Sequence, residues 1–428
     1  MTTIPHEKST LPNGIRLITL PMTGTEAVTV MVYIRAGSRF ENERNNGIAH
    51  FLEHMFFKGT QKRPTTLDIS REIEEVGGEF NAWTSEEYTG YYFKVTRPHT
   101  ELAIDLVSDM LLHSKFDPEE IEREKGVILQ EINMYRDDPR SHIYNVWEAV
   151  LYPGDQAGRP VIGSPETVKS FTRDTFTNFV QQRYQAQGTV VAIAGNFKTP
   201  KVAEIVTSYF KDAPTGAIAP QPTIHVSQSM PNVLIHHKKT DQAHFALGVR
   251  GYDMFHKDRY ALQLLAVILG GGMSSRLFIE IRERRGLAYY VGTRADNATD
   301  TGNLATFAGV QTDKADAAIT TTLQEYVKIA DTPVDIAELT KAKEMIKGGM
   351  LLGLESSEER ATWGGVQELL RNEITPVGEI IKRIDAVTPQ DIKRVAQDVF
   401  NKRALNLAII GPFQNREMFA TILEKHFR

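Results

Sequence analysis

Residues 47–59 read Gly47-Ile-Ala-His-Phe-Leu-Glu-His-Met-Phe-Phe-Lys-Gly59. If this stretch is helical, His50 and His54 lie one turn apart on the same face. Two imidazoles at this spacing can hold one metal ion, and Glu53 on the same side can accept a proton from water at that ion. The order His-x-x-Glu-His inverts the commoner His-Glu-x-x-His zinc motif. The stretch therefore predicts a zinc site. The competing interpretation is two helix-face histidines with a solvated glutamate between them.

Composition limits the classes of protein to consider. The chain has 428 residues, of which 41% are hydrophobic and 24% charged, as in globular proteins large enough for more than one domain. A net charge of -5 without a Lys/Arg cluster argues against nucleic acid as the main partner. Cysteine is absent, so any zinc must use His and carboxylate ligands. Residues 1–10 lack a signal-like apolar segment, and no run of about 18 apolar residues occurs. We therefore expect a cytoplasmic protein without a membrane partner.

The first half of the chain mixes strand and helix patterns. A hairpin is predicted around Pro12-Asn-Gly14, and the β-branched run 27–35 predicts a central strand. Asp117-Pro118 is a strong helix start, and this helix should reach about residue 136. Further helices are predicted over 66–76, 102–113 and 171–183, two strands within 79–96, and one strand over 189–195. The mixture predicts an α+β fold in which antiparallel-rich sheets are flanked by helices.

The second half of the chain repeats the first. Ala192-Ile-Ala-Gly195-Asn-Phe197 returns as Ala408-Ile-Ile-Gly411-Pro-Phe413, and Thr172 returns as Thr388, both at an offset of 216 residues. Ile34-Arg-Ala-Gly37 resembles the segment around 249–251 at nearly the same offset. Such a repeat predicts two homologous domains. We place them at 1–215 and 223–428, joined by a linker rich in Pro, Gly and Ala.

The repeat also predicts that the two domains differ in function. Carried across at that offset, the His50 helix falls on residues 264–270, which contain no metal-ligand side chain. Glu131 falls near Gly348-Gly349. The metal site should therefore belong to the first domain alone. Histidines that only filled the core would show the same asymmetry.

A catalytic zinc site needs a third protein ligand from another element. Glu124 and Glu131 are seven residues apart, so both lie on one face of the predicted helix. Glu131 follows the apolar run 127–129, which indicates partial burial. The competing interpretation is a solvated acidic face.

Taken together, these motifs resemble the M16 metallopeptidases. His50-x-x-Glu53-His54 is followed by Glu131 after a gap of 76 residues. The resemblance covers nearly the whole chain and includes Phe57-Lys-Gly-Thr60, Asn81-Ala-Trp-Thr-Ser85, Val127-Ile-Leu-Gln-Glu131 and Gly286-Leu-Ala-Tyr289. It implies that His50, His54 and Glu131 bind Zn²⁺, that Glu53 is the general base, and that Glu124 is a carboxylate behind the ligands.

The resemblance implies roles for two more segments. The strand with Asn81, Ala82 and Trp83 would bind the substrate as an added β-strand; without the resemblance, an ordinary aromatic core strand is preferred. Arg282 and Tyr289 would donate hydrogen bonds to the substrate near the zinc. Arg284 and Arg285 are near competitors for Arg282, and a surface Arg cluster with a core Tyr is the alternative.

The resemblance further implies a zinc endopeptidase that hydrolyses unfolded oligopeptides inside a chamber enclosed by a dimer. A homodimer is favoured because one chain carries both the zinc motif and the Arg/Tyr pair. Ser141 and Asn145 stand about where presequence-processing members carry acidic residues, which argues against that role. Two alternatives stay open: a catalytic subunit of an obligate heteromeric processing peptidase, inactive alone, and a binding relative that keeps a metal without turnover.

Overall fold

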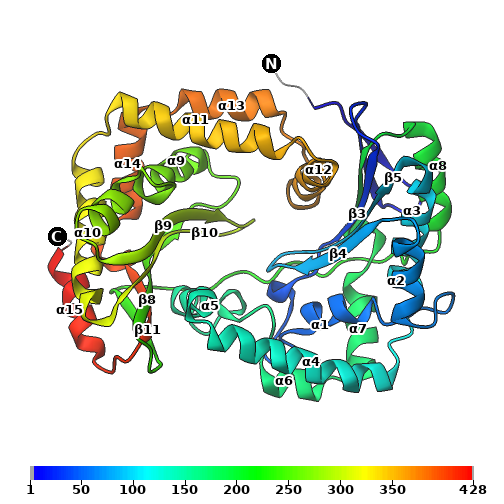
Figure 1. The fold of residues 1–428 in the computed structure, drawn as a ribbon, viewed down its shortest axis with the longest axis horizontal. Coiled ribbons are helices and arrows are strands. Elements are labelled where there is room, and N and C mark those ends of the chain that lie inside the picture. Colours follow the sequence, from blue (N-terminus) through cyan, green and yellow to red (C-terminus); the bar gives the residue numbers. More distant parts are fainter. Residues whose placement is uncertain (1–3, 427–428) are drawn as a thin grey trace. The chain divides into compact units, whose positions relative to one another are not determined.

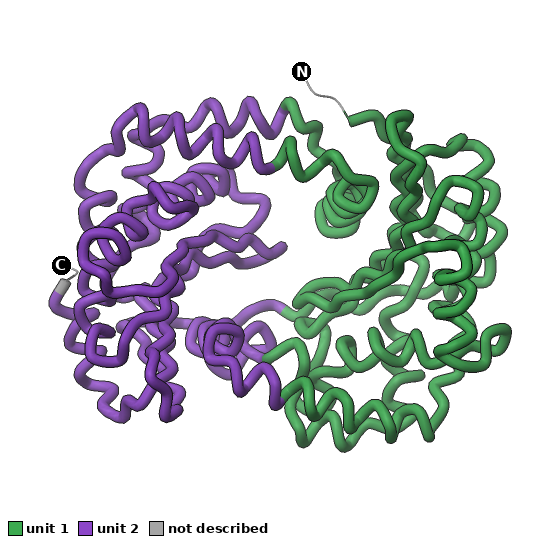
Figure 2. The backbone as a smooth tube through the Cα atoms, in the orientation of Figure 1, with its two compact units in different colours: residues 1–132, 160–222, 350–378 green, residues 133–159, 223–349, 379–428 purple. Residues whose placement is uncertain are grey.

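The computed structural model describes residues 4–426. They form two compact units, drawn in different colours in Figure 2. Unit 1 comprises the described residues up to 132 together with 160–222 and 350–378. Unit 2 comprises 133–159, 223–349 and the described residues from 379 onward.

Unit 1 is built on a six-stranded sheet with the order β1-β2-β6-β3-β5-β4. Figure 1 labels β3, β4 and β5 of this sheet. β2 and β6 are parallel and the other neighbours are antiparallel, so the sheet is mixed. The predicted hairpin is present as β1 and β2, with Gly14 in its turn at a φ of 98°. The predicted central strand is β3, and β4 lies at the edge. The strands are β1 (Glu7–Thr10), β2 (Arg16–Pro21), β3 (Ala27–Ile34), β4 (Glu79–Thr84), β5 (Thr89–Thr96) and β6 (Thr189–Gly195).

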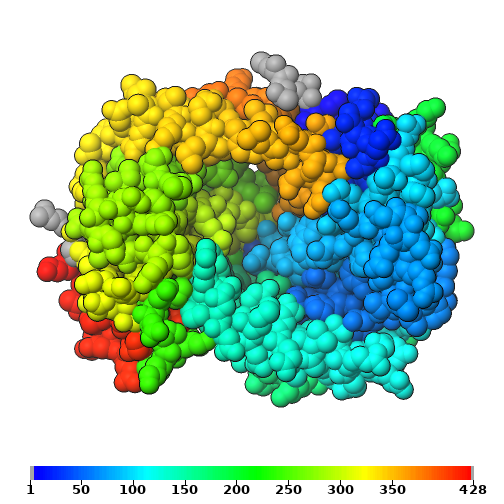
Figure 3. All heavy atoms as spheres, in the orientation of Figure 1, coloured from blue at the N-terminus to red at the C-terminus, as the bar shows by residue number. Residues whose placement is uncertain are grey.

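Helices pack on both faces of this sheet. Alternate β3 residues Val28, Val30 and Val32 point into one core shared with α1, α3 and α7, because side chains alternate between the faces of a strand. α4 lies on the surface, as its cyan atoms show in Figure 3. The helices of this part of the chain are α1 (Ile48–Met55), α2 (Thr66–Glu74), α3 (Thr100–His113), α4 (Pro118–Asp137), α6 (Pro165–Ser170), α7 (Arg173–Arg183) and α8 (Thr199–Tyr209).

Unit 2 repeats the same strand order without a counterpart of β1. Its sheet runs β7-β11-β8-β10-β9, and its one parallel pair, β7 with β11, corresponds to β2 with β6. The duplicated strand plan predicted from the sequence is thereby confirmed. The strands are β7 (Asn232–His237), β8 (Gln242–Gly251), β9 (Ala288–Asn297), β10 (Gly302–Gln311) and β11 (Asn406–Gly411).

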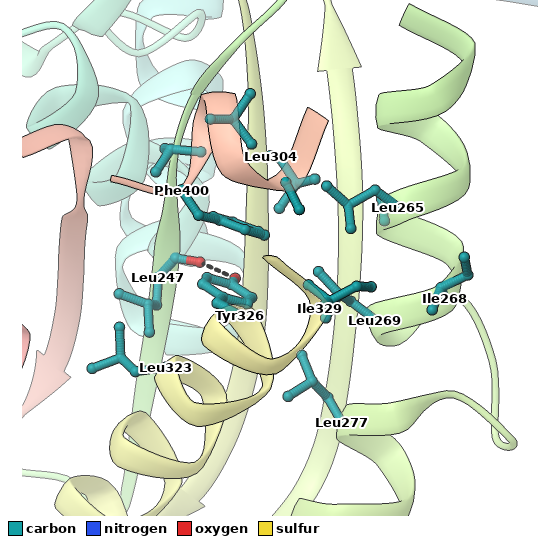
Figure 4. Close-up of a cluster of buried hydrophobic side chains, with 14 of the residues drawn as sticks. Leu247, Leu265, Ile268, Leu269, Leu277, Leu304, Leu323, Tyr326, Ile329 and Phe400 are labelled. Atoms are coloured by element: carbon teal, nitrogen blue, oxygen red, sulfur yellow. Dashed lines mark hydrogen bonds between the residues drawn. The ribbon is translucent and has the colours of Figure 1, made fainter. Parts of the chain in front are cut away.

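One core of unit 2 lies between this sheet and helices α9, α10 and α14 (Figure 4). Phe400 stacks on Tyr326 of α10 there, with ring centres 4.1 Å apart, and Leu265 of α9 belongs to the same core. The Tyr326 hydroxyl donates to the carbonyl of Leu247, 2.9 Å away. The later helices are α9 (Arg259–Gly270), α10 (Ala315–Asp331), α11 (Ile336–Gly353), α13 (Val377–Ala386), α14 (Pro389–Val399) and α15 (Arg416–His426).

Two helices are exchanged between the repeats. α5 (Pro139–Leu151) comes from the first half of the chain but packs on β8 and β11 of unit 2. α12 (Ser357–Arg371) comes from the second half but packs on β3 and β6 of unit 1 (Figures 1 and 2). The approach of α12 requires a glycine, because a Cβ at Gly365 would lie 2.3 Å from the ring of Tyr33. Each sheet is thus covered on one face by a helix of the other repeat.

Candidate metal centre

The helix that carries both histidines begins with an unusual cap. Gly47 is the N-cap residue at a φ of 94°. The carboxylate that accepts the first free N–H groups comes from Glu41, whose oxygens lie 2.7 Å from Gly47 N and 2.8 Å from Ala49 N. Glu41 is only 4% exposed. A buried anion at a helix N-terminus is stabilising, so Glu41 fixes where α1 starts. Sequence reasoning missed it because it lies outside the helix.

α1 and α4 bring three potential ligands together. Nε2 of His50 lies 3.6 Å from Oε1 of Glu131, and Nε2 of His54 lies 3.6 Å from Oε2 of the same carboxylate. Ligand atoms of the three side chains all fall within 4.8 Å of one another, the one such group found among residues 4–426. Four tetrahedral ligands at ~2.1 Å from zinc stand ~3.4 Å from each other. The three side chains therefore fit a single zinc ion.

Both carboxylates near the histidines are ionised. Burial alone would raise the pKa of Glu131, but its hydrogen bond to His50 and the charge of that ring outweigh burial and lower the pKa. Burial of Glu124 is likewise outweighed by its contacts with His54 and Lys58, which lower its pKa. The predicted partial burial of Glu131 is confirmed. An ionised carboxylate is the form that binds a metal ion.

Glu124 links His54 to a lysine. Its Oε1 lies 2.9 Å from Nδ1 of His54, and its Oε2 lies 2.6 Å from Nζ of Lys58. Glu124 is 3% exposed. A carboxylate on Nδ1 makes that nitrogen the donor and leaves Nε2 as the atom for a metal. Glu124 therefore sets the orientation of His54. Lys58, to which the sequence analysis assigns no role, balances the charge of Glu124.

Glu53 lies on the same helix and contacts the edge strand of the sheet. The Thr84 hydroxyl donates to Oε2 of Glu53 over 2.7 Å. Thr84 is the last residue of β4, which also carries Asn81, Ala82 and Trp83. Thr84 thus connects the predicted base, Glu53, to the predicted substrate strand. The sequence analysis assigns no role to Thr84.

Comparison with known proteins gives the family. The family model described as Insulinase (Peptidase family M16) matches residues 17–164, and the Peptidase M16 inactive domain matches residues 170–346. An uncharacterized zinc protease of Streptomyces coelicolor is 36% identical over 96% of this chain and 90% of its own. The chain belongs to the M16 peptidase family. It is a zinc protease, a hydrolase of peptide bonds.

Other relatives of this M16 protease have similar lengths. The uncharacterized zinc protease YmxG of Bacillus subtilis is 34% identical, covering 96% of this chain and 99% of its own. The crystal structure of a protease from Helicobacter pylori superimposes with a TM-score of 0.90 at 24% identity, covering 96% of this chain and 100% of that one. This second likeness shows the shared fold. The M16 protease therefore resembles bacterial members of similar length, and it carries both M16 domains in tandem.

The predicted Arg/Tyr pair of the M16 protease lies in unit 2. Arg284 and Arg285 both pair with Glu280, whereas Arg282 has no acidic partner in the described part of the chain and stacks on Phe278, 4.9 Å from its ring centre. Tyr289 stands at a β-bulge of β9, where the pairing with β10 skips it, and its side chain is 55% exposed. Bulges redirect side chains, and the predicted alternative of a core Tyr does not apply to Tyr289. Arg282 is exposed as well, so both predicted residues are accessible to a ligand.

Every helix within residues 4–426 is either too short or too polar to span a membrane. The cytoplasmic location that we expect from the sequence stays a prediction.

Proposed function

We propose that this M16 protease is an endopeptidase for unfolded oligopeptides, with zinc held by His50, His54 and Glu131. The observation that carries the proposal is the convergence of two imidazole Nε2 atoms on one carboxylate at equal distances of 3.6 Å. Bound zinc would lower the pKa of a water molecule toward neutrality and polarise the scissile carbonyl. Side chains of this protein would carry out the proton transfers and bind the substrate.

Glu53 is the proposed general base. It accepts the proton of the attacking water and later delivers it to the leaving amine. Its carboxylate is held at one oxygen by the Thr84 hydroxyl. Glu124 keeps Nδ1 of His54 as a hydrogen-bond donor. Arg282 and Tyr289 are proposed as donors to the substrate. Both are exposed, and neither has an acidic partner within residues 4–426, which supports this role.

The substrate is proposed to bind along β4 at Asn81, Ala82 and Trp83. β4 ends the sheet of unit 1, and an edge strand presents main-chain donors and acceptors to an extended peptide. Recognition through the main chain depends little on side chains, which suits an enzyme for many peptides. Only an unfolded segment can add to a sheet in this way, so folded proteins should be spared.

We further propose that the enzyme works as a homodimer that encloses the peptide, with residues 1–215 as the catalytic domain and 223–428 contributing Arg282 and Tyr289. One chain holds every proposed chemical group, so no second kind of subunit is needed for the chemistry. A catalytic subunit of an obligate heteromer is the alternative.

Glu53→Gln tests the mechanism. The amide keeps the shape of the side chain but cannot accept the proton, so zinc content should stay at one per chain while cleavage of a quenched fluorescent peptide falls at least ~100-fold. Zinc analysis and a chelator control accompany the assay. Full activity of Glu53→Gln would refute the assigned mechanism. An inactive wild-type chain with bound zinc, eluting as a monomer, would favour the heteromer.

A further inference from the structure

The Thr84 hydroxyl has two acceptors within reach but one proton to donate. Its Oγ1 lies 2.7 Å from Oε2 of Glu53 and 3.4 Å from the carbonyl oxygen of Ala49. The shorter contact to a charged oxygen takes the proton, because hydrogen bonds to carboxylates are stronger and shorter. We propose that Thr84 is a positioning residue for Glu53, which it holds in the orientation needed to accept the water proton. This inference rests on the role of Glu53 as general base.

Glu53 depends on this contact for its orientation. Among residues 4–426, Thr84 is the one hydrogen-bond partner found for the Glu53 carboxylate. A glutamate side chain has three rotatable bonds, and a catalytic group must be held within about 0.5 Å of its working position. The hydroxyl contacts Oε2, and Oε1 has no hydrogen-bond partner among residues 4–426, so Oε1 is free to accept a proton. The two oxygens of the Glu53 carboxylate therefore differ: Thr84 holds Oε2, and Oε1 can accept the proton.

The backbone that presents the hydroxyl is itself fixed. Thr84 pairs with Thr89 across β4 and β5, and the next residue, Ser85, closes the turn by donating its N–H to Tyr88 over 2.8 Å. The same turn is tied to the segment after β3, since Arg39 N donates to Glu86 O over 2.9 Å. The end of β4 therefore holds the Thr84 hydroxyl in a fixed position, and the hydroxyl can act as an anchor for Glu53.

The anchor lies on the strand proposed to bind substrate. Asn81, Ala82, Trp83 and Thr84 are consecutive in β4, so the element that sets the register of the peptide also holds the base. A single strand thereby aligns the scissile bond and the proton acceptor. Loss of the hydroxyl should then affect turnover much more than peptide affinity.

Thr84→Val tests the inference, because valine has the same shape without the donor. We expect kcat to fall ~30-fold, since misplacement of a catalytic group by 1 Å costs up to ~100-fold, while KM changes less than ~2-fold and zinc stays at one per chain. Thr84→Ser, which keeps the hydroxyl, should retain kcat within ~3-fold. The matched control is Thr29→Val, which removes another hydroxyl of the same sheet, one bonded to Ser357 over 2.8 Å.

A readout without turnover is the affinity of a peptide hydroxamate, measured by calorimetry on the zinc-loaded chain. The hydroxamate group needs a correctly placed carboxylate to accept its proton, so Thr84→Val should weaken binding ~10-fold and Thr29→Val should not. Equal kcat and equal hydroxamate affinity in both valine variants would overturn the inference. Loss of zinc from Thr84→Val would also overturn the inference, and so would a kcat of Thr84→Ser as low as that of Thr84→Val. Either result would show that Thr84 has a structural role.

Glu53→Gln, measured in parallel, separates this inference from the proposed function. If Glu53→Gln keeps its activity, the proposed mechanism itself fails. If Glu53→Gln is inactive while Thr84→Val turns over like Thr29→Val, the base is correctly assigned and only the role of Thr84 is wrong.

Discussion

Lys58 is the residue whose removal best probes the contacts behind the proposed metal ligands. It lies 2.6 Å from the buried Glu124 carboxylate, which also holds His54. Lys58→Met would leave His54 as the remaining side-chain partner of that carboxylate among residues 4–426, and the loss of such an outer partner weakens metal binding by 10–100-fold in general. We expect zinc affinity, measured by competition with a chromophoric chelator, to fall ~10-fold while kcat at saturating zinc changes less than ~3-fold.

Lys125 of α4 provides a matched control for Lys58. Lys125 stands beside Glu124 in the sequence but pairs with Glu122, whose side chain is 71% exposed, and ion pairs with an exposed partner contribute little. Lys125→Met should therefore leave zinc affinity unchanged. Equal affinities of the two methionine variants would contradict the role assigned to Lys58.

The site residues also show what a sequence can predict at this scale. His50, Glu53 and His54 are linked by helical spacing, a local rule that holds wherever the helix forms. Thr84 and Glu124 meet the same helix from 31 and 70 residues away. No periodicity connects such distant positions. Their roles require either the structure or, as for Glu124, a family resemblance.

At the scale of elements, the packing of α5 on unit 2 creates a histidine pair. His142 of α5 meets His236 of β7 with ring centres 4.7 Å apart. Burial, the charge of His236 and the nearby Arg136 and Lys238 lower the pKa of His142 to about 4, and burial also lowers the pKa of His236. Both rings are therefore neutral in the folded protein at neutral pH.

This pair predicts loss of stability in acid. Between pH 6.5 and 4 the unfolded chain binds a proton at His142 that the folded chain does not, so the free energy of unfolding falls as pH falls through this window. His142→Gln should flatten the pH dependence of the urea midpoint relative to wild type. His237→Gln, at an exposed neighbouring position of the same strand, is the control. A parallel pH dependence of His142→Gln and wild type would show that His142 is not responsible.

At the scale of the whole molecule, the sequence predicts the two repeats but not the exchange of their helices. The repeat follows from anchors such as Gly195 and Gly411, which end equivalent strands. The exchange cannot be derived from the sequence in this way. An apolar face on α5 or α12 predicts that the helix packs against a sheet, but it does not identify which of the two sheets that is. The repeat units in the sequence and the compact units in space therefore contain different segments.

The exchange predicts how a fragment of the chain should behave. A fragment of residues 1–222 lacks α12, so Met31 and Tyr33 of β3 lose the helix that covers them. It also carries α5, whose buried Trp147 belongs to the core of unit 2. Two uncovered apolar surfaces should make the fragment bind a hydrophobic dye and unfold without a sharp transition.

A peptide of residues 350–378, added to the fragment, should reduce dye binding because it covers the sheet. The same peptide with Gly365→Leu should not, because a side chain at that position meets Tyr33. If the fragment alone unfolded cooperatively and bound zinc as tightly as the full chain, α12 would be dispensable for unit 1.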